Sequence, residues 1–364
     1  MIKRISDFDL SGRNTFRMRV RCAMFVEVSE EADLEALDWD SLPRPVKVIG
    51  GGSNLLFTGD FPGTLIHFSG GLSMAGPSPC PCPGVDRPTE ACTATASHIT
   101  LPSGTVFDEF CEWAAGSGLW GPENLSLIPG EVGASAVQNI GAYGVEAKDI
   151  IAGIRAWDMI ERRFVDIDPE ECEYGYRASR FKTEWKDRFV ITAVTFRLSR
   201  EPRPRLDYGG LRKALEGKGK LTPELIRRVI IDIRNSKLPP VEKIGSAGSF
   251  FCNPIVPCDV YEKVLSIARS ERGDDAAVPH FDLPEGVKIP AAWLIDTCGL
   301  KGAERGGAAV YQNQPLVIVN ASGAATPADI LALERHIIDS VFAKYGITLH
   351  PEVEHVGDIE NKNQ

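Results

Sequence analysis

The most informative part of the sequence is a loop of small residues, Ile128-Pro129-Gly130-Glu131-Val132-Gly133-Ala134-Ser135-Ala136-Val137-Gln138-Asn139-Ile140-Gly141-Ala142-Tyr143-Gly144. It begins with a proline that suits the start of a helix, and it continues with small residues and two amides. Small side chains let the backbone approach a flat ligand, helical N–H groups near Gly130 suit a pyrophosphate, and Gln138 and Asn139 suit the edge of a flavin ring. A close-packed helix junction also uses Gly and Ala, so this loop alone leaves both interpretations open.

A second glycine-rich loop, Gly50-Gly51-Gly52-Ser53-Asn54-Leu55, follows a predicted strand from Val46 to Ile49. Backbone N–H groups can converge on a phosphate there because no side chains intervene. The dinucleotide fingerprint would need a third glycine where Leu55 stands and then a helix, which Gly59, Pro62 and Gly63 disfavour. A Walker loop would need Gly-Lys-Ser/Thr, which is absent. A tight surface turn remains the alternative.

Size and composition limit the class of protein. The 364 residues predict two to three domains of about 150 residues each. A hydrophobic fraction of 43% and a charged fraction of 25% are typical of a folded chain, and the net charge of −10 disfavours binding to nucleic acid. The first residues contain no apolar stretch of a secretory signal, and no run reaches about 18 apolar residues, so we expect a cytoplasmic protein without a membrane span.

Cysteine spacing gives no sign of a metal site. Nine cysteines are scattered along the chain, and Cys80, Cys82 and Cys92 lie in or beside a proline-rich insertion from Ala75 to Glu90. An odd, scattered set suits reduced thiols, and the spacing matches no standard zinc pattern. We therefore expect no metal and interpret the insertion as a solvated loop.

Hydrophobic periodicity predicts alternating strands and helices around the two loops. Predicted strands cover Phe16 to Val20, Met24 to Val28, Val46 to Ile49, Thr64 to Phe68, Ile154 to Trp157, Phe164 to Ile167 and Phe189 to Leu198. Predicted helices start at Thr105 and end near Gly116, and cover Pro223 to Asn235, Trp293 to Leu300 and Pro327 to Tyr345, with Gly346 closing the last one. A hairpin is predicted around Gln312 to Pro315, and the last strand is expected to carry His350-Pro351-Glu352.

The two loops and five further motifs occur in family order. These motifs are Tyr176-Arg177-Ala178-Ser179-Arg180-Phe181-Lys182, Pro204-Arg205-Leu206-Asp207-Tyr208-Gly209, Lys237-Leu238-Pro239, Gly248-Ser249-Phe250-Phe251-Cys252-Asn253-Pro254 and Pro351-Glu352-Val353. Together they span nearly the whole chain. The sequence thus resembles UDP-N-acetylenolpyruvoylglucosamine reductases, and specifically the first type, whose tyrosine-bearing loop covers the substrate.

The resemblance implies a mixed α/β (α+β) fold. It predicts a two-part FAD-binding half of the vanillyl-alcohol-oxidase type in residues 1–70 and 71–220. A separate substrate-binding domain is predicted in residues 221–348, and residues 349–364 are expected to form a terminal strand and tail. It also implies NADPH-dependent reduction of UDP-N-acetylglucosamine enolpyruvate to UDP-N-acetylmuramate, with non-covalent FAD, in peptidoglycan precursor synthesis. We expect a monomer whose partners are the UDP-sugar and NADPH.

Carried over position by position, the resemblance assigns three groups of site residues. Arg177, Ser249 and Glu352 form the catalytic set, and Tyr208, Lys237, Asn253 and Gln314 contact the UDP-sugar. FAD is assigned to Gly50, Gly51, Gly52, Ser53, Asn54, Leu55, Ile128, Pro129, Gly130, Gly133, Ala134, Ser135, Gln138, Asn139, Gly141, Tyr143, Gly144 and Lys301. The sequence departs from the family at Ala178, Cys252 and Glu354, where an acid, a lysine and a basic residue are common.

Residue chemistry supports these roles. Arg177 can pair with a carboxylate through two hydrogen bonds, which suits the negative charge that develops when a hydride reaches an enolpyruvyl ether. Ser249 becomes a plausible proton donor when the acceptor is strongly basic, and Glu352 must be protonated or paired to avoid repelling the enolate. Taken singly, these residues are more often a surface arginine, a turn serine and a strand-end acid. A flavin oxidase acting on another alcohol or sugar, and a flavin-binding protein without catalysis, remain the alternatives.

Overall fold

The computed structural model describes residues 2–71, 95–208, 210–240 and 242–357. Contacts divide the chain into two units that alternate along the sequence. Unit 1 comprises Met1–Phe8, Cys22–Gly52 and Pro62–Asn235, and unit 2 comprises Asp9–Arg21, Ser53–Phe61 and Ser236–Gln364. The insertion from Ala75 to Glu90, with Cys80 and Cys82, lies outside the described residues, as do Cys92 and Gly209.

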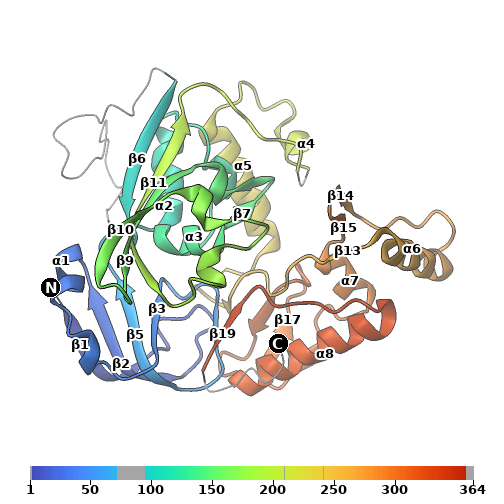
Figure 1. The fold of residues 1–364 in the computed structure, drawn as a ribbon. Helices are drawn as coiled ribbons and strands as arrows, with labels where there is room; N and C mark the ends of the chain where they lie inside the picture. Colours follow the sequence, from blue (N-terminus) through green and yellow to red (C-terminus); the bar gives the residue numbers. More distant parts are fainter. Residues whose placement is uncertain (1, 72–94, 209, 241, 358–364) are drawn as a thin grey trace. The chain divides into compact units, whose positions relative to one another are not determined.

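The first sheet of unit 1 has the strand order β1-β2-β5-β3 and is drawn in blue in Figure 1. β3 and β5 run parallel, with Val46 opposite Thr64. The apolar faces of β2 and β5 pack against the short helices that follow β2, and Trp39 stacks on Trp157 at 6.2 Å. The elements are β1 (Lys3–Asp9), β2 (Arg21–Val28), α1 (Glu31–Ala36), η1 (Trp39–Ser41), β3 (Val46–Ile49) and β5 (Phe61–Phe68).

One predicted strand, Phe16 to Val20, is wrong. Its alternating residues Phe16, Met18 and Val20 are buried as a strand pattern requires. The backbone of Met18, however, is bound by the side chain of Asn14, which donates to Met18 O (3.1 Å) and accepts from Met18 N, and the Phe16 carbonyl accepts from the side chain of Asn320. A buried asparagine side chain therefore supplies hydrogen bonds that a neighbouring strand would otherwise supply.

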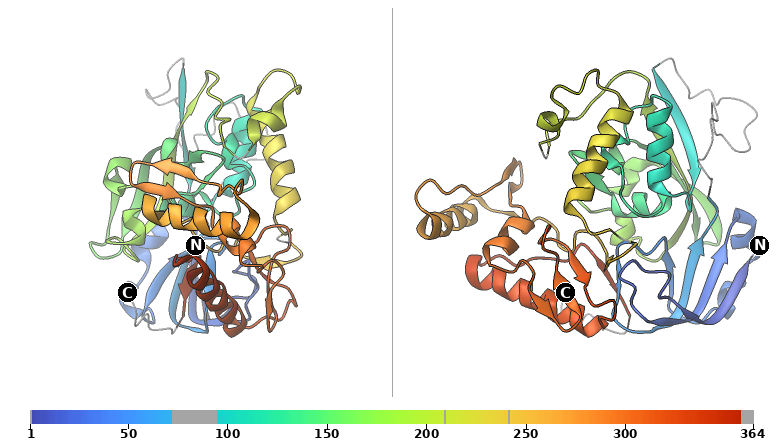
Figure 2. Two further views of the ribbon diagram at one scale, coloured as in Figure 1. Left: turned by 90° about the vertical axis from the view of Figure 1, so that its right-hand side faces the viewer. Right: turned by 180° about the vertical axis from the view of Figure 1, so that it is seen from behind.

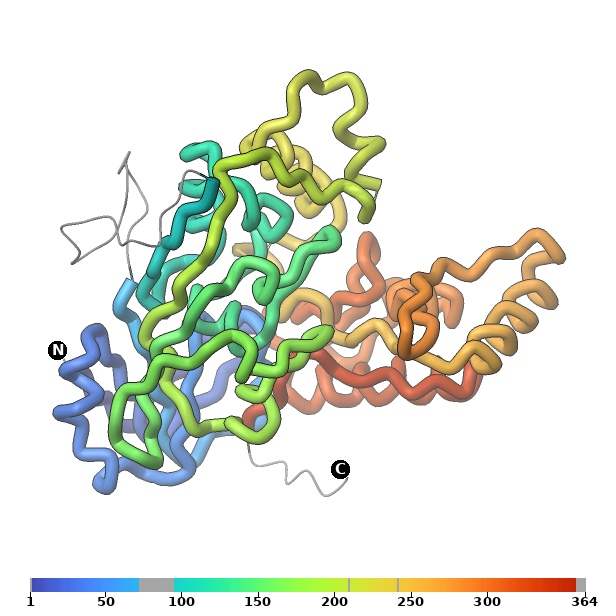
Figure 3. Tube along the Cα trace, turned by 45° about the horizontal axis from the view of Figure 1, so that its top comes forward, coloured from blue at the N-terminus to red at the C-terminus, as the bar shows by residue number. Residues whose placement is uncertain are grey.

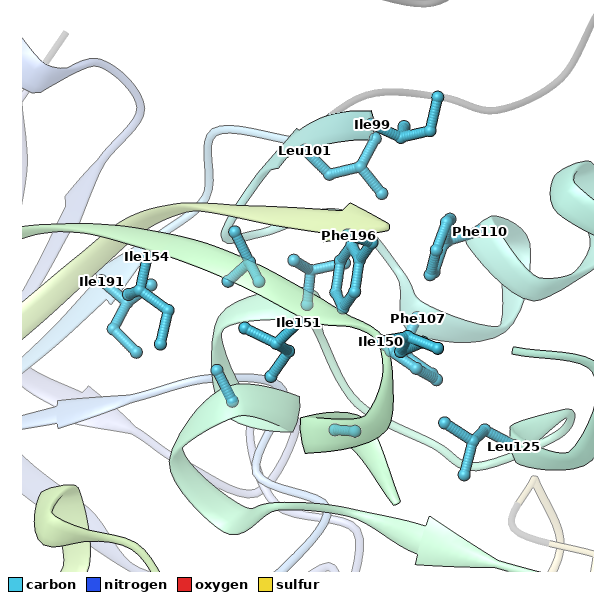
Figure 4. Close-up of a cluster of buried hydrophobic side chains, with 14 of the residues drawn as sticks. Ile99, Leu101, Phe107, Phe110, Leu125, Ile150, Ile151, Ile154, Ile191 and Phe196 are labelled. Carbon is cyan, nitrogen blue, oxygen red and sulfur yellow. The ribbon is translucent and has the colours of Figure 1, made fainter. Parts of the chain in front are cut away.

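The second sheet of unit 1 is antiparallel, with the order β10-β9-β11-β6. Helices α2 and α3 cover one face, where Phe107 and Phe110 of α2 meet Phe196 of β11 (Figure 4). Burial of these aromatic side chains supplies much of the core's stabilisation. The elements are β6 (Ala96–Pro102), α2 (Phe107–Gly116), η2 (Glu123–Leu125), α3 (Val132–Gln138), β7 (Gly141–Ala142), β8 (Val145–Glu146), η3 (Ala147–Asp149), β9 (Ile151–Asp158), β10 (Arg163–Ile167), η4 (Pro169–Cys172), η5 (Arg180–Lys182) and β11 (Phe189–Ser199).

Helix α5 (Pro223–Lys237) packs beside α2, as the yellow and teal helices of Figure 2 show. The guanidinium of Arg227 donates to the Asp108 carboxylate of α2, with Nη2 and Oδ2 3.0 Å apart. Before α5, the chain makes a long excursion from β11 that includes α4 (Leu211–Leu215), drawn yellow-green in Figure 3. The unit division therefore falls after Asn235, whereas the sequence-based domain boundary falls after residue 220.

Unit 2 contains a four-stranded sheet of order β12-β18-β17-β16, a three-stranded sheet of order β13-β15-β14, and the parallel pair β19-β4. Helix α8 was predicted correctly at both ends, because Thr326 accepts from Asp329 N at its start and Gly346, with φ 67°, ends it. The elements are β4 (Leu55–Phe57), β12 (Gly245–Ser246), β13 (Ile255–Val256), α6 (Cys258–Arg272), β14 (Phe281–Leu283), β15 (Gly286–Lys288), α7 (Ala291–Thr297), β16 (Glu304–Arg305), β17 (Ala308–Val310), β18 (Ile318–Asn320), α8 (Pro327–Tyr345) and β19 (Glu354–Val356).

The terminal strand begins later than predicted. β19 covers Glu354–Val356, whereas His350-Pro351-Glu352 precedes it and joins the chain near Phe251 through an isolated bridge from Phe251 to Pro351. A proline cannot donate to a strand ladder, which accounts for the interruption. Among the described residues, no helix is long and apolar enough to cross a membrane, and no cluster of three or more His, Cys, Asp or Glu is arranged to hold a metal ion.

Candidate active site

In unit 1 the glycines Gly50 and Gly51 lie directly against the start of the Ile128–Gly144 stretch. A Cβ added at Gly50 would lie 3.2 Å from both Ala134 Cβ and Glu131 Oε2, and one added at Gly51 would lie 3.8 Å from Gly130 Cα. Gly130 has φ 119°, a backbone conformation that side-chain-bearing residues rarely adopt. Two segments about eighty residues apart in sequence thus form one backbone-lined surface, as the sequence predicts for a cofactor cradle.

The start of α3 is bound to the segment that joins β6 to α2. Val132 N donates to Thr105 O and Gly133 N to Ser103 O, both at 2.9 Å. A Cβ at Gly133 would lie 1.9 Å from Ser103 Oγ, so this glycine is required for packing. Ser135 Oγ also donates to the backbone, at Val132 O. The N–H groups of Val132 and Gly133 are therefore used within the protein, and the pyrophosphate role predicted for N–H groups near Gly130 stays a prediction.

The two amides of the loop have different environments. Asn139 is fully buried, and its amide nitrogen donates to Glu146 Oε2 (2.9 Å) and to Gly175 O (2.8 Å), while its oxygen accepts from Lys148 N. With φ 44° it also ends α3, so its side chain stabilises the fold, and its predicted role at a flavin edge stays a prediction. Gln138 Oε1, in contrast, is buried without a hydrogen-bond partner among the described residues. Such an orphan acceptor calls for a donor from a ligand.

Gly141, Tyr143 and Gly144 belong to a tight hairpin formed by β7 and β8. Tyr143 (φ 47°) and Gly144 (φ 79°) form a two-residue loop with two positive φ angles, the geometry that suits a β-hairpin. Tyr143 O accepts from Asn124 Nδ2 at 2.8 Å, and the same amide donates to Arg205 O at 2.8 Å. The sequence did not point to Asn124, whose only local signal is its place just before the Ile128–Gly144 stretch.

Arg177 lies at the tip of a turn closed by paired hydrogen bonds between Gly175 and Ala178. Its φ of 54° is unusual for arginine and indicates that the surrounding structure fixes this residue. Nη2 donates to Gly141 O at 2.7 Å, which places the guanidinium beside the β7–β8 hairpin. The fold thus holds a permanent positive charge next to the predicted cofactor loop.

Tyr208 lies near the same hairpin. A Cβ at Gly144 would lie 3.3 Å from Tyr208 Cβ. Burial raises the pKa of Tyr208 above its usual value, and the positive charge of Arg177 opposes that shift. The structure therefore brings the predicted catalytic arginine, the predicted substrate-covering tyrosine and three predicted cofactor residues together in unit 1.

A charged cluster that the sequence did not reveal lies under the glycine loop. His67 is buried, with Nε2 3.0 Å from Glu131 Oε1 and Nδ1 3.4 Å from Glu27 Oε2. The Glu131 carboxylate faces Gly50 and Gly51. Glu131 lies inside the Ile128–Gly144 stretch, but only the tertiary structure shows that its carboxylate meets the imidazole of His67.

In unit 2 the segment that carries Ser249 pairs with the segment that carries Glu352. Glu352 N donates to Phe250 O at 2.8 Å, and Cys252 N donates to His350 O at 2.9 Å. Phe250 and Phe251 are buried, so the Ser249 segment is anchored in the core on one side. Residues about a hundred positions apart in sequence are thereby held next to each other on one hydrogen-bonded backbone.

The other predicted ligand-binding residues of unit 2 lie on separate elements. Asn253 Oδ1 accepts from Ala291 N at 2.9 Å and so fixes the start of α7. Gln314 lies in the turn between β17 and β18, where Val317 N donates to its carbonyl oxygen. Lys301 is exposed and pairs with Asp296 at 3.1 Å, and Lys237 is the exposed last residue of α5. Ligand roles for these four side chains stay predictions.

Comparison with known proteins accounts for both units. Residues 239–356 match the family model "UDP-N-acetylenolpyruvoylglucosamine reductase, C-terminal domain", and residues 23–160 match "FAD binding domain". A UDP-N-acetylenolpyruvoylglucosamine reductase of Bacteroides fragilis (strain YCH46) is 42% identical over 348 residues, covering 95% of this chain and 98% of the relative. The chain belongs to the UDP-N-acetylenolpyruvoylglucosamine reductase family. A reductase of the same name from Porphyromonas gingivalis (strain ATCC BAA-308 / W83) is 39% identical, covering 96% of this chain and 98% of the relative.

The fold of this reductase is also that of a solved structure. A UDP-N-acetylenolpyruvylglucosamine reductase from Thermus caldophilus superimposes with a TM-score of 0.64 at 21% identity, covering 98% of this chain and 99% of that one. The predicted mixed α/β fold with an FAD-binding half is confirmed. The chain is a flavin-dependent oxidoreductase, and the matched families give no support to the oxidase and the non-catalytic binding protein considered from sequence.

The residues present fit FAD. The backbone-lined surface at Gly50, Gly51 and Gly130 excludes side chains where a flat or phosphate-bearing group needs close approach. Gln138 Oε1 supplies a buried acceptor that lacks a protein donor. No histidine lies within the two glycine-rich loops, which agrees with non-covalent binding.

Proposed function

We propose that this chain reduces UDP-N-acetylglucosamine enolpyruvate to UDP-N-acetylmuramate with NADPH and non-covalent FAD, a step in peptidoglycan precursor synthesis. The observation that carries the proposal is the pairing of the Ser249 and Glu352 segments in a member of this reductase family. FAD, when bound, supplies the hydride store that no side chain provides.

The predicted residues of unit 1 would stabilise the negative charge that develops on the substrate. Hydride addition to the terminal carbon of the enolpyruvyl group leaves negative charge that spreads into the substrate carboxylate. Arg177, fixed by its bond to Gly141 O, would bind that carboxylate and stabilise the charge. Tyr208 would cover the bound sugar, and its raised pKa keeps the phenol protonated.

The predicted residues of unit 2 would supply the proton that completes the reduction. Ser249 Oγ would deliver a proton to the carbon next to the carboxylate, which completes reduction of the double bond. Glu352 would act beside Ser249, since Glu352 N donates to the carbonyl oxygen of Phe250, the residue that follows Ser249. Lys237, Asn253 and Gln314 would bind the UDP-sugar, and Lys301 would contribute to FAD binding.

Steady-state oxidation of NADPH with and without the enolpyruvyl UDP-sugar tests the proposal. We expect rapid NADPH oxidation that depends on the sugar and yields UDP-N-acetylmuramate in equal amount. Rapid oxidation with oxygen alone, with no effect of the sugar, would overturn it in favour of an oxidase. NADH in place of NADPH measures the donor preference.

We also propose that the protein works as a cytoplasmic monomer that does not bind nucleic acid. The net charge of −10 supports the last point, because binding to nucleic acid relies on neutralising phosphates with Lys and Arg. Light scattering of the purified protein measures the oligomeric state, and a dimer mass would contradict the proposal.

A further inference from the structure

We propose that Asn54 is a positioning residue that holds Glu352 and, through the Glu352 peptide, Ser249. The inference rests on the proposed function, which assigns Glu352 and Ser249 to reduction of the sugar. It changes the role of Asn54, because the sequence assigns this residue to FAD.

Asn54 contacts the Glu352 segment at two points. Its side-chain nitrogen donates to Glu352 O at 3.1 Å, and its backbone oxygen accepts from Glu354 N at 3.0 Å. The contact continues into the parallel pair β4–β19, where Leu55 lies opposite Glu354. The segment 352–354 is therefore held at two points by one residue, Asn54, near the end of the glycine-rich loop.

The other side of the Glu352 peptide is tied to the Ser249 segment. Glu352 N donates to Phe250 O at 2.8 Å, and Phe250 N donates to Leu316 O at 2.8 Å. Phe250 is fully buried and directly follows Ser249. The backbone oxygen of Glu352 is thus bound by Asn54, and its backbone nitrogen is bound by the Ser249 segment. A shift at Asn54 therefore reaches both predicted catalytic residues.

Loss of the Asn54 amide would leave the Glu352 carbonyl without this donor and would loosen the segment just before β19. A displacement of about 1 Å at a catalytic group can cost on the order of a hundredfold in rate. The damage would fall on the step in which the sugar is reduced, because NADPH oxidation requires no proton from Ser249.

Asn54→Ala and the nearly isosteric Asn54→Asp test the proposal in the full-length holoenzyme by anaerobic stopped-flow. We expect reduction of the flavin by NADPH and the Kd for FAD to stay within about twofold, while reduction of the sugar slows by about tenfold or more at saturating sugar. Asp should be the worse variant, because its carboxylate repels the Glu352 carbonyl. It also provides a second test if the alanine variant folds poorly.

Thr58→Val is the matched control. Thr58 Oγ1 donates to Val356 O at 3.3 Å, so this variant removes a side-chain bond between the same two segments but away from Glu352. We expect its two half-reactions to resemble those of the wild type. Equal slowing in Thr58→Val would overturn a specific role for Asn54.

Glu352→Gln alone, and combined with Asn54→Ala in a double variant, shows whether Asn54 acts through Glu352. If Asn54 acts partly through the Glu352 side chain, Asn54→Ala should slow the Glu352→Gln enzyme by a smaller factor than it slows the wild type. A raised Kd for FAD with both half-reactions slowed would overturn the inference and return Asn54 to the cofactor site. Slowing by Glu352→Gln without slowing by Asn54→Ala overturns only the inference, whereas no effect of Glu352→Gln overturns the proposed role of Glu352 and the inference with it.

Discussion

At the scale of single residues, backbone hydrogen bonds hold the segments that carry the predicted catalytic residues. Arg177 is fixed through Gly141 O, and Ser249 and Glu352 are fixed through the paired backbone of residues 250–252 and 350–352. Such rigid supports limit the movement of the groups they carry. A substitution at one of these side chains should therefore change the chemistry without changing the fold.

Ser249→Ala should slow only reduction of the sugar. The expected loss is about a hundredfold to ten-thousandfold, the usual range for a positioned proton donor, with flavin reduction by NADPH close to wild type. Anaerobic stopped-flow measures the two half-reactions separately. Ser340→Ala is the control, because that hydroxyl donates only within α8, to His336 O. Slowing confined to flavin reduction would exclude Ser249 as the acid.

Tyr208→Ala should raise the KM for the sugar by about tenfold, equivalent to about 1.4 kcal/mol of binding, and leave flavin reduction nearly intact. Burial raises the pKa of Tyr208, so the phenol stays protonated up to and beyond its ordinary pKa of about 10. The wild-type KM should consequently show no tyrosine ionisation between about pH 7 and 10. Tyr261→Ala, on α6, is the control, and a KM unchanged by Tyr208→Ala would contradict the role in substrate binding.

Among the secondary-structure elements, α5 is held to α2 by an ion pair between the two helices. Arg227 is nearly buried and is paired with Asp108 of α2, and the charge and hydrogen bonds of Asp108 keep the pKa of Arg227 above its usual value despite the opposing effect of burial. The apolar side of α5 packs with Trp120 and Leu206. These contacts bind the helix to unit 1.

Arg227→Ala should lower the free energy of unfolding by about 3 kcal/mol, because it leaves the Asp108 carboxylate without its buried partner. Denaturant unfolding monitored by circular dichroism measures the change. The exposed neighbour Arg228 is the matched control, and Arg228→Ala should change stability by less than about 0.5 kcal/mol. Equal effects of the two substitutions would show that the ion pair does not stabilise the packing of α5 on α2.

For the molecule as a whole, cofactor binding and stability should be linked. The purified protein should be yellow, release FAD on denaturation, and gain about 2.7 kcal/mol of stability when free FAD is a hundred times its Kd. Gly50→Val should reduce both effects, because the new side chain would meet Ala134 and Glu131. Gly12→Val, where a Cβ meets nothing within 4 Å, is the control. A colourless protein that cannot be reconstituted with FAD would contradict the whole assignment.

The sequence by itself determined the features that depend on short-range physics. Helix α8 could be predicted to the residue because its cap at Thr326, its proline and its closing Gly346 are local signals. The strand Val46–Ile49 and the two glycine-rich loops were identified in the same way, and the ordered motifs identified the family. The predicted strand at Phe16 to Val20 failed because the side chain of Asn14 satisfies the backbone there, which no alternation of apolar residues can reveal.

Only the tertiary structure decided which segments meet. The bond from Asn54 to Glu352 joins residues 298 positions apart, and the contact between His67 and Glu131 joins residues 64 apart. The hydrogen bonds from the Asn139 amide to Glu146 and Gly175 also depend on how the chain folds back on itself. Hydrogen bonds and charge pairing depend on distances between atoms, and a sequence pattern fixes such distances only within a helix turn or a strand.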